Sequence, residues 1–148
     1  MFNERLIPWF RQSKIEALFL KKDPNVRWAS GFKGKDSCVL MTPDGGFLIT
    51  DPRYTEQAEL EAPDFTLVNW RAVGGTMMKA LAHVCKEQNI KSIGFESDAL
   101  SFGEYSQLKA ETDAELIPTE NVVENLRSIK TPEEIEDLRA ACEISCRA

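Results

Sequence analysis

Apolar and polar positions along the chain follow two different periods, and their succession predicts a domain that mixes strands and helices. Short apolar runs bounded by Gly, Pro, Asp or Asn are typical of strands, whereas apolar residues three and four positions apart are typical of helices. Strands are expected over 16–20, 37–42, 47–50, 65–70, 92–96 and 114–118. Helices are expected over 2–14, 23–29, 51–61 and 76–89, and from residues 101, 122 and 131 onward.

The segment 37–50 predicts a β-hairpin. Two strand-like runs flank Pro43-Asp44-Gly45-Gly46, in which proline fixes φ and the glycines are expected to take positive φ. The hairpin makes one strand pair antiparallel, whereas the later strand–helix–strand units favour parallel crossovers. The fold class is therefore α/β with a mixed sheet.

The residues after the hairpin predict the start of a helix. Asp51 can accept hydrogen bonds from free backbone amides, and Pro52 fits the first helical position because its missing donor costs little there. Arg53 and Tyr54 then lie on the first turn, and Ala58 continues the buried stripe together with Leu60 or Ala62.

Other helix boundaries carry similar signals. Pro8 is expected to kink the first helix or to make it start late, and Asp23 or Asn25 is expected to cap a short turn that Gly31 ends. Ser101 to Glu104 and Thr131 to Glu134 have the pattern of capping boxes.

The last helix has no stop signal. Ile135, Leu138, Ala141 and Cys142 continue an apolar stripe toward Ala148, and neither Gly nor Pro follows. Either this helix packs on the domain and frays, or the chain is the first part of a longer protein; the second interpretation is preferred.

Composition narrows the function classes. With 24 acidic and 18 basic residues, the net charge of −6 makes nucleic acid and anionic membranes poor partners, because both need clustered Lys and Arg. Membrane-spanning runs and a signal peptide are absent from the sequence, which favours the cytoplasm. The four cysteines form no C-x-x-C pair and are interpreted as reduced, and His83 is interpreted as solvated.

Recognisable catalytic motifs are missing from the sequence. It contains no H-E-x-x-H, no G-x-S-x-G, no Walker loop and no G-x-G-x-x-G, and a single histidine makes a typical zinc site improbable. The residues by themselves indicate a soluble, non-catalytic α/β domain.

Three stretches together carry a family resemblance: "NVRWASGFKGKDSCVLMTPDGGFLITDPRYTEQA", "IGFESDALSFGEYSQLK" and "IPTENVVENLRSIKTPEEIEDLRAACEISCRA". In order and spacing they resemble the N-terminal domain of the creatinase and prolidase (Xaa-Pro peptidase, M24 metallopeptidase) family, over nearly the whole chain. The resemblance implies a three-layer α/β/α, ribonuclease H-like domain over residues 1–130. It also implies that 131–148 is a linker helix leading into an absent pita-bread catalytic domain.

In such relatives the catalytic domain holds two divalent metals, Mn, Co or Zn, on two Asp, one His and two Glu, none of which can be placed here. The resemblance therefore implies a chain without cofactors and without catalytic or metal-binding residues of its own. Its expected role is to shape the active-site entrance for short X-Pro peptides and to contact the chain's own catalytic domain and a second subunit, as in a homodimer.

The same resemblance supplies four candidate residues at the substrate entrance. Asn25 and Trp28 match the segment near the entrance in some relatives, and Arg53 and Tyr54 match an Asp-x-Arg-Tyr turn. Pro52 stands where relatives frequently have glycine, which argues against a close backbone approach at that point.

Two alternatives stay open at this stage. The parent protein could be a catalytically dead family member that uses this domain as a protein-binding module, for which the acidic charge allows a basic partner. It could also carry a creatinase-like amidinohydrolase or lyase half.

Overall fold

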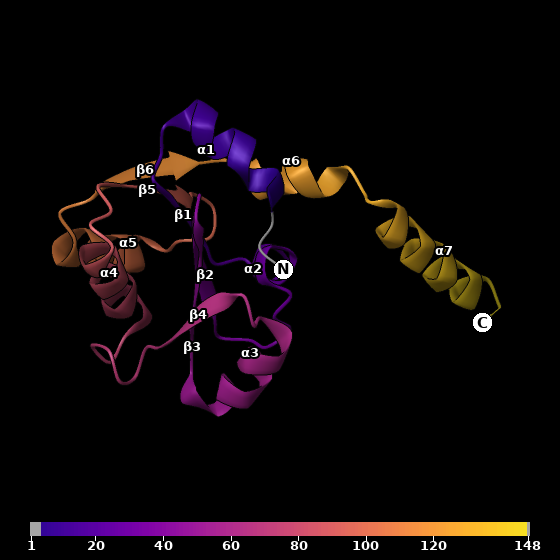
Figure 1. Ribbon diagram of the computed structural model, residues 1–148, viewed down its shortest axis with the longest axis horizontal. Coiled ribbons are helices and arrows are strands. Elements are labelled where there is room, and N and C mark those ends of the chain that lie inside the picture. The colour runs from indigo at the N-terminus through magenta and orange to yellow at the C-terminus, as the bar shows by residue number, and fades with distance from the viewer. Residues whose placement is uncertain (1–3, 148) are drawn as a thin grey trace.

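The computed structural model describes residues 4–147 and contains, over that range, a six-stranded mixed sheet in the order β4-β3-β2-β1-β5-β6 (Figure 1). The strands are β1 (Ala17–Leu20), β2 (Cys38–Thr42), β3 (Gly45–Thr50), β4 (Phe65–Asn69), β5 (Ser92–Glu96) and β6 (Glu115–Thr119). Strand β2 is antiparallel to both β1 and β3, and the other pairs are parallel. All the predicted strands and the mixed sheet are confirmed.

Helices cover both faces of this sheet and make the three predicted layers (Figure 1). One face carries α4 (Met77–Glu87) and α5 (Phe102–Glu111). The other carries α1 (Ile7–Ser13), α2 (Asp23–Ser30), α3 (Thr55–Glu61) and α6 (Val122–Ser128). Side chains alternate between the two cores as the period of a strand requires: Phe19 points to the first, and its neighbours Leu18 and Leu20 point to the second.

The hairpin is confirmed, but its turn differs from the prediction. Thr42 pairs with Gly45, so only Pro43 and Asp44 form the turn, and the Thr42 hydroxyl donates to the Gly45 carbonyl at 3.1 Å. Neither Gly45 nor Gly46 has positive φ, because both already belong to β3. Gly46 is needed for space instead, since a Cβ there would lie 2.2 Å from the ring of Phe65.

The helix start after β3 is confirmed. Asp51 caps a 3₁₀ turn over Pro52–Tyr54, its carboxylate accepting the backbone N–H of Arg53 at 3.1 Å, and α3 follows directly. The capping boxes that open α5 and α7 (Pro132–Arg147) also form as predicted. Gly31, with φ of 80°, ends α2.

Of the two predictions for the first helices, the one for α1 is confirmed and the one for α2 is wrong. Helix α1 starts late, at Ile7 after a 3₁₀ turn over Glu4–Leu6, as Pro8 predicted; the expected residues before Glu4 lie outside the described part of the chain. The capping role of Asp23 or Asn25 is wrong. Helix α2 already begins at Asp23 without a side-chain cap from the described residues, and Asn25 is buried inside it.

Several large apolar side chains in or next to the helices are exposed, because each helix packs on the sheet along one side only. Phe102, Leu60 and Ile129 are 84%, 83% and 70% exposed, whereas Ala62 is buried. In α4, Met78 is buried, whereas Met77 is only partly buried.

Helix α7 extends away from the layered body (Figure 1). None of its described residues is buried, and Ile135, Leu138 and Ile144 all stand exposed. The predicted stripe is therefore present but has no core to enter within residues 4–147. No helix in that range is long and apolar enough to cross a membrane.

Candidate functional site

All four candidate residues follow strands that end at the same edge of the sheet. Strands β1, β3, β4, β5 and β6 run in one direction, so that Leu20, Thr50, Asn69, Glu96 and Thr119 end them together. We call this the carboxyl edge. Helix α2, with Asn25 and Trp28, follows β1, and the turn with Arg53 and Tyr54 follows β3. Ligands in α/β proteins commonly bind outside the carboxyl ends of parallel strands.

Glu96, at the end of β5, organises the first part of this edge. Its carboxylate is 7% exposed and accepts the backbone N–H groups of Lys21 and Lys22 at 2.7 and 2.8 Å. The other carboxylate oxygen accepts the Asn25 amide at 2.5 Å. A buried carboxylate needs such donors, so Glu96 joins the start of α2 to the end of β5.

Asn25 is fully buried, and its side chain is fully used. Its amide nitrogen donates to Glu96 and, at 2.9 Å, to Glu124 of α6, while its oxygen accepts from Arg127 at 2.7 Å. Lys22 reaches the same Glu124 at 2.8 Å and Asp98 at 2.6 Å. Hydrogen bonds to Asp98 and then Glu124 raise the pKa of Lys22, and the network ties α2 to α6.

Trp28 lies one turn further along α2 and is half-buried. The guanidinium of Arg5 stands 5.5 Å from its ring, and Arg5 also donates to the carbonyls of Leu126 and, at 2.8 Å, of Ile129. Trp28 lines a groove of about 510 Å³ between α2, α6 and the first turns of α7, together with Arg127 and Leu138. Of the four candidates, only Trp28 faces this groove.

Asp51 organises the second part of the edge, at the ends of β3 and β4. It is 1% exposed, and its two carboxylate oxygens accept the Nε–H groups of Arg53 at 2.8 Å and Arg71 at 2.7 Å. The hydrogen bonds from the Arg53 side chain and backbone, and then from Arg71, hold the pKa of Asp51 well below its usual range. Asp51 in turn raises the pKa of Arg53.

Aromatic rings support both arginines. Arg53 stands 5.7 Å from the ring centre of Tyr54, and Tyr54 packs edge-on against Phe32 at 6.0 Å. Arg71 stands 4.5 Å from the ring centre of Trp70. Tyr54 is therefore a packing residue next to Arg53.

Sequence reasoning missed Glu96, Glu124, Arg127 and Arg71. Glu96 closes the apolar run "SIGFE", and a carboxylate at the end of a buried strand is a signal that could have been used. Arg71 has no such signal, because its contact with Asp51 depends on how β4 lies beside β3.

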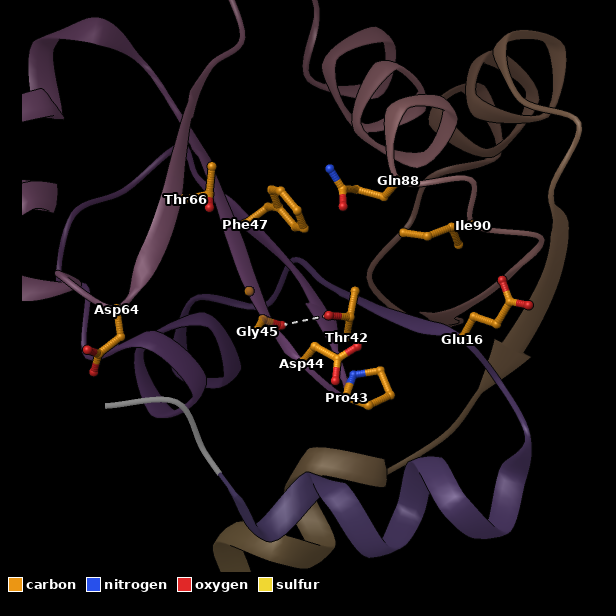
Figure 2. Close-up of a pocket in the computed structure, with 11 residues that line it drawn as sticks. Glu16, Thr42, Pro43, Asp44, Gly45, Phe47, Asp64, Thr66, Gln88 and Ile90 are labelled. Carbon is orange, nitrogen blue, oxygen red and sulfur yellow. Dashed lines mark hydrogen bonds between the residues drawn. The ribbon is translucent and has the colours of Figure 1, made fainter.

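The opposite edge of the sheet contains another large hollow, of about 530 Å³ (Figure 2). Glu16, Asp44 and Asp64 line it beside Phe47 and Ile90. Glu16 accepts the Lys91 backbone N–H at 2.6 Å, and the Thr42 hydroxyl is used inside the hairpin turn, as the dashed line in Figure 2 shows. None of the four candidate residues lies here.

The arrangement of possible metal ligands and of the cysteines gives no sign of a metal site in the described residues. Within residues 4–147, no group of three or more His, Cys, Asp or Glu is placed to hold a metal ion. His83 is exposed and lies 3.3 Å from Glu87. Cys38 and Cys85 are buried, and burial raises the pKa of Cys85 to about 12, whereas Cys142 and Cys146 are exposed.

A six-stranded mixed sheet between two helical layers, with its polar residues at one carboxyl edge, defines an α/β domain of ribonuclease H-like type. The model of the creatinase/prolidase N-terminal domain family matches residues 3–129. The chain belongs to this family, as the resemblance indicated.

Individual relatives agree. The chain is 35% identical over 143 residues to an uncharacterized peptidase, YqhT, of Bacillus subtilis, covering 96% of this chain and 40% of the relative. Its fold matches that of the Xaa-Pro dipeptidase from Bacillus anthracis with a TM-score of 0.82 and 37% identity, covering 90% of this chain and 37% of that one. The N-terminal domain of the cytoplasmic peptidase PepQ from Mycobacterium tuberculosis matches with a TM-score of 0.74 and 30% identity, covering 83% and 95%. The chain thus spans about two fifths or less of the length of the curated peptidases it resembles.

Proposed function

We propose that this chain is the non-catalytic N-terminal domain of a metal-dependent Xaa-Pro dipeptidase or aminopeptidase, and that it shapes the active-site entrance and the subunit contacts. The observation that carries this proposal is the family match over residues 3–129 in a chain that spans about two fifths of peptidase relatives. We place the protein in the cytoplasm, where the similar peptidase PepQ of Mycobacterium tuberculosis is described.

The residues present do not fit a dinuclear metal centre. The two buried carboxylates, Asp51 and Glu96, are engaged by N–H donors, and no other group of donors within residues 4–147 is suitable. We therefore assign the two divalent metals, Mn, Co or Zn, to the rest of the parent protein. When bound there, they would supply the activated water that attacks the bond before proline.

Helix α7 is proposed as the linker into that catalytic domain. The family match stops at residue 129, just before the helix begins, and the exposed side chains of Ile135, Leu138 and Ile144 need a partner. An isolated helix of this length is marginal in water, so packing against the following domain would stabilise it.

The entrance role is assigned to Trp28 first. It lines the groove at the base of α7, where the chain leaves the domain, whereas Asn25 is enclosed and holds α2 and α6 in place. Arg53 lies further along the same edge and is exposed enough to meet a short X-Pro peptide or a second subunit, whereas the partly buried Tyr54 would act by supporting it.

The test is to assay the 148-residue chain and the full product of its reading frame on an X-Pro dipeptide with Mn²⁺. We expect no hydrolysis by the chain above a metal-only blank, and hydrolysis by the full product. Turnover by the chain alone would contradict the proposal. A full product without the two Asp, one His and two Glu would favour the binding module. A full product with those ligands that cleaves neither an X-Pro dipeptide nor a longer X-Pro peptide would favour the creatinase-like or lyase alternative.

A further inference from the structure

We propose that Arg53 and Arg71 form a binding site for an oxyanion, a phosphate or a carboxylate, at the carboxyl ends of β3 and β4. This inference goes beyond the peptidase family and rests on how one buried carboxylate positions two exposed guanidinium groups. It does not depend on a catalytic domain.

The two guanidinium groups are fixed before any ligand arrives. Each donates its Nε–H to a different oxygen of Asp51, at 2.8 Å from Arg53 and 2.7 Å from Arg71. Because both oxygens belong to one buried carboxylate, Asp51 ties the two groups to the same point of the edge. Tyr54 and Trp70 support them from below, at 5.7 and 4.5 Å. A pre-organised arginine loses little side-chain freedom when it binds.

The outer edges of both groups remain available. Arg53 and Arg71 are 66% and 57% exposed, and their Nη nitrogens make no hydrogen bond to any residue in the described part of the chain. An Nη pair is a planar fork of N–H donors that matches the spacing of two oxygens in a carboxylate or phosphate. Two such forks beside each other can bind one oxyanion from both sides.

The surrounding charges limit the strength of the site. Asp51 neutralises one of the two arginines, and Asp36 acts electrostatically on Arg53. The site therefore selects by fork geometry more than by net charge. We expect a dissociation constant on the order of 1 mM for inorganic phosphate.

The first experiment titrates inorganic phosphate into the ¹⁵N-labelled chain at constant ionic strength, following the arginine side-chain N–H signals by NMR. We expect saturable shifts in the signals of Arg53 and Arg71. Chloride at the same ionic strength is the control, and equal shifts with both anions would overturn the proposal.

Variants separate fork geometry from charge. Arg53→Lys with Arg71→Lys keeps both charges but removes both forks, and we expect phosphate affinity to fall about tenfold. Arg139→Lys, on the exposed face of α7, is the matched control and should leave affinity unchanged. Asp36→Asn should tighten binding, and asparagine tolerates the positive φ of 52° at this position. Unchanged affinity in the double lysine variant would contradict the inference.

The oxyanion that binds Arg53 and Arg71 could be a free anion or a carboxylate of a second copy of the chain. Light scattering distinguishes these two sources. If a second copy supplies the carboxylate, the chain self-associates at high concentration, phosphate dissociates it, and the double lysine variant stays monomeric. Saturable phosphate binding by a monomer supports a free anion instead. The absence of both phosphate binding and arginine-dependent association would overturn the proposal.

Discussion

Two buried carboxylates stand at the carboxyl edge of this sheet, and they have opposite surroundings. Glu96 accepts two backbone N–H groups and the side-chain amide of the buried Asn25. Asp51 is equally buried, but its side-chain partners are two arginines more than half exposed. The comparison shows two uses of a buried carboxylate. It can join elements of the fold, as Glu96 does, or it can position side chains that still have free N–H groups for a ligand, as Asp51 does. Which it does depends on what its partners have left to donate.

Removing Glu96 should have the largest effect on stability. Glu96→Ala leaves the amides of Lys21, Lys22 and Asn25 without their acceptor, and should lower the free energy of unfolding by about 3 kcal/mol. Urea unfolding followed by circular dichroism measures this. Glu115→Ala, at an exposed position of β6, is the control and should cost less than about 0.5 kcal/mol. Similar losses of stability in both variants would show that the buried Glu96 matters no more than an exposed glutamate.

Asn25 should come next. Asn25→Ala removes three hydrogen bonds between α2, β5 and α6 and should cost about 2 kcal/mol. Asn25→Asp should be worse, because it places a third carboxylate against Glu96 and Glu124. Thermal unfolding of both, with Asn125→Ala on the exposed side of α6 as the control, tests this order. A neutral Asn25→Ala would leave the residue free for a direct role at the entrance.

Asp51 should show a smaller effect that depends on pH. Its folded-state pKa is lowered, so the stability from its ionisation is present above the unfolded pKa of about 4 and is lost as pH falls through the folded value. Asp51→Asn should therefore be less stable than the wild type at neutral pH, and the gap should shrink in acid. Urea unfolding at about pH 7 and about pH 3 compares them. A gap that does not change with pH would contradict the assigned ionisation.

The two arginines should matter least for stability. Since both are more than half exposed, Arg53→Lys and Arg71→Lys should each cost less than about 1 kcal/mol. Denaturant midpoints of the two variants and of Arg139→Lys provide the comparison. A loss as large as that of Glu96→Ala would make the arginine pair a structural element and not a binding site.

Sequence reasoning succeeded where the partners are neighbours in the chain. Asp51 was predicted as a cap because its first partner, Arg53, lies two residues away, and the same holds for the capping box at Ser101. The sequence predicted a mixed sheet but not the order of its strands. It predicted only some of the residues that each helix buries. Phe102 and Leu60 fit the helical period but meet no core, because each helix covers only a strip of the sheet.

The rest of the site could not be predicted from local patterns. Glu96 meets Lys21 and Asn25 across 75 and 71 residues, and Arg71 meets Asp51 across 20, so these contacts exist only once the strands are in register. Asparagine is a residue type that favours the N-cap position. Asn25 nevertheless lies inside helix α2, where its tertiary hydrogen bonds outweigh that local preference. The four candidates taken from the family resemblance lie at one edge of the sheet, and the contacts distinguish the enclosed Asn25 from the exposed Arg53.

The most direct test measures stability and phosphate affinity side by side in two variants, Glu96→Gln and the double variant Arg53→Lys with Arg71→Lys. Glu96→Gln should lower the free energy of unfolding by about 2 kcal/mol while phosphate binds as in the wild type. The double lysine variant should keep nearly all its stability and lose about tenfold in affinity. If both variants lost stability and affinity in the same proportion, the two carboxylates would belong to a single network and the account would be wrong.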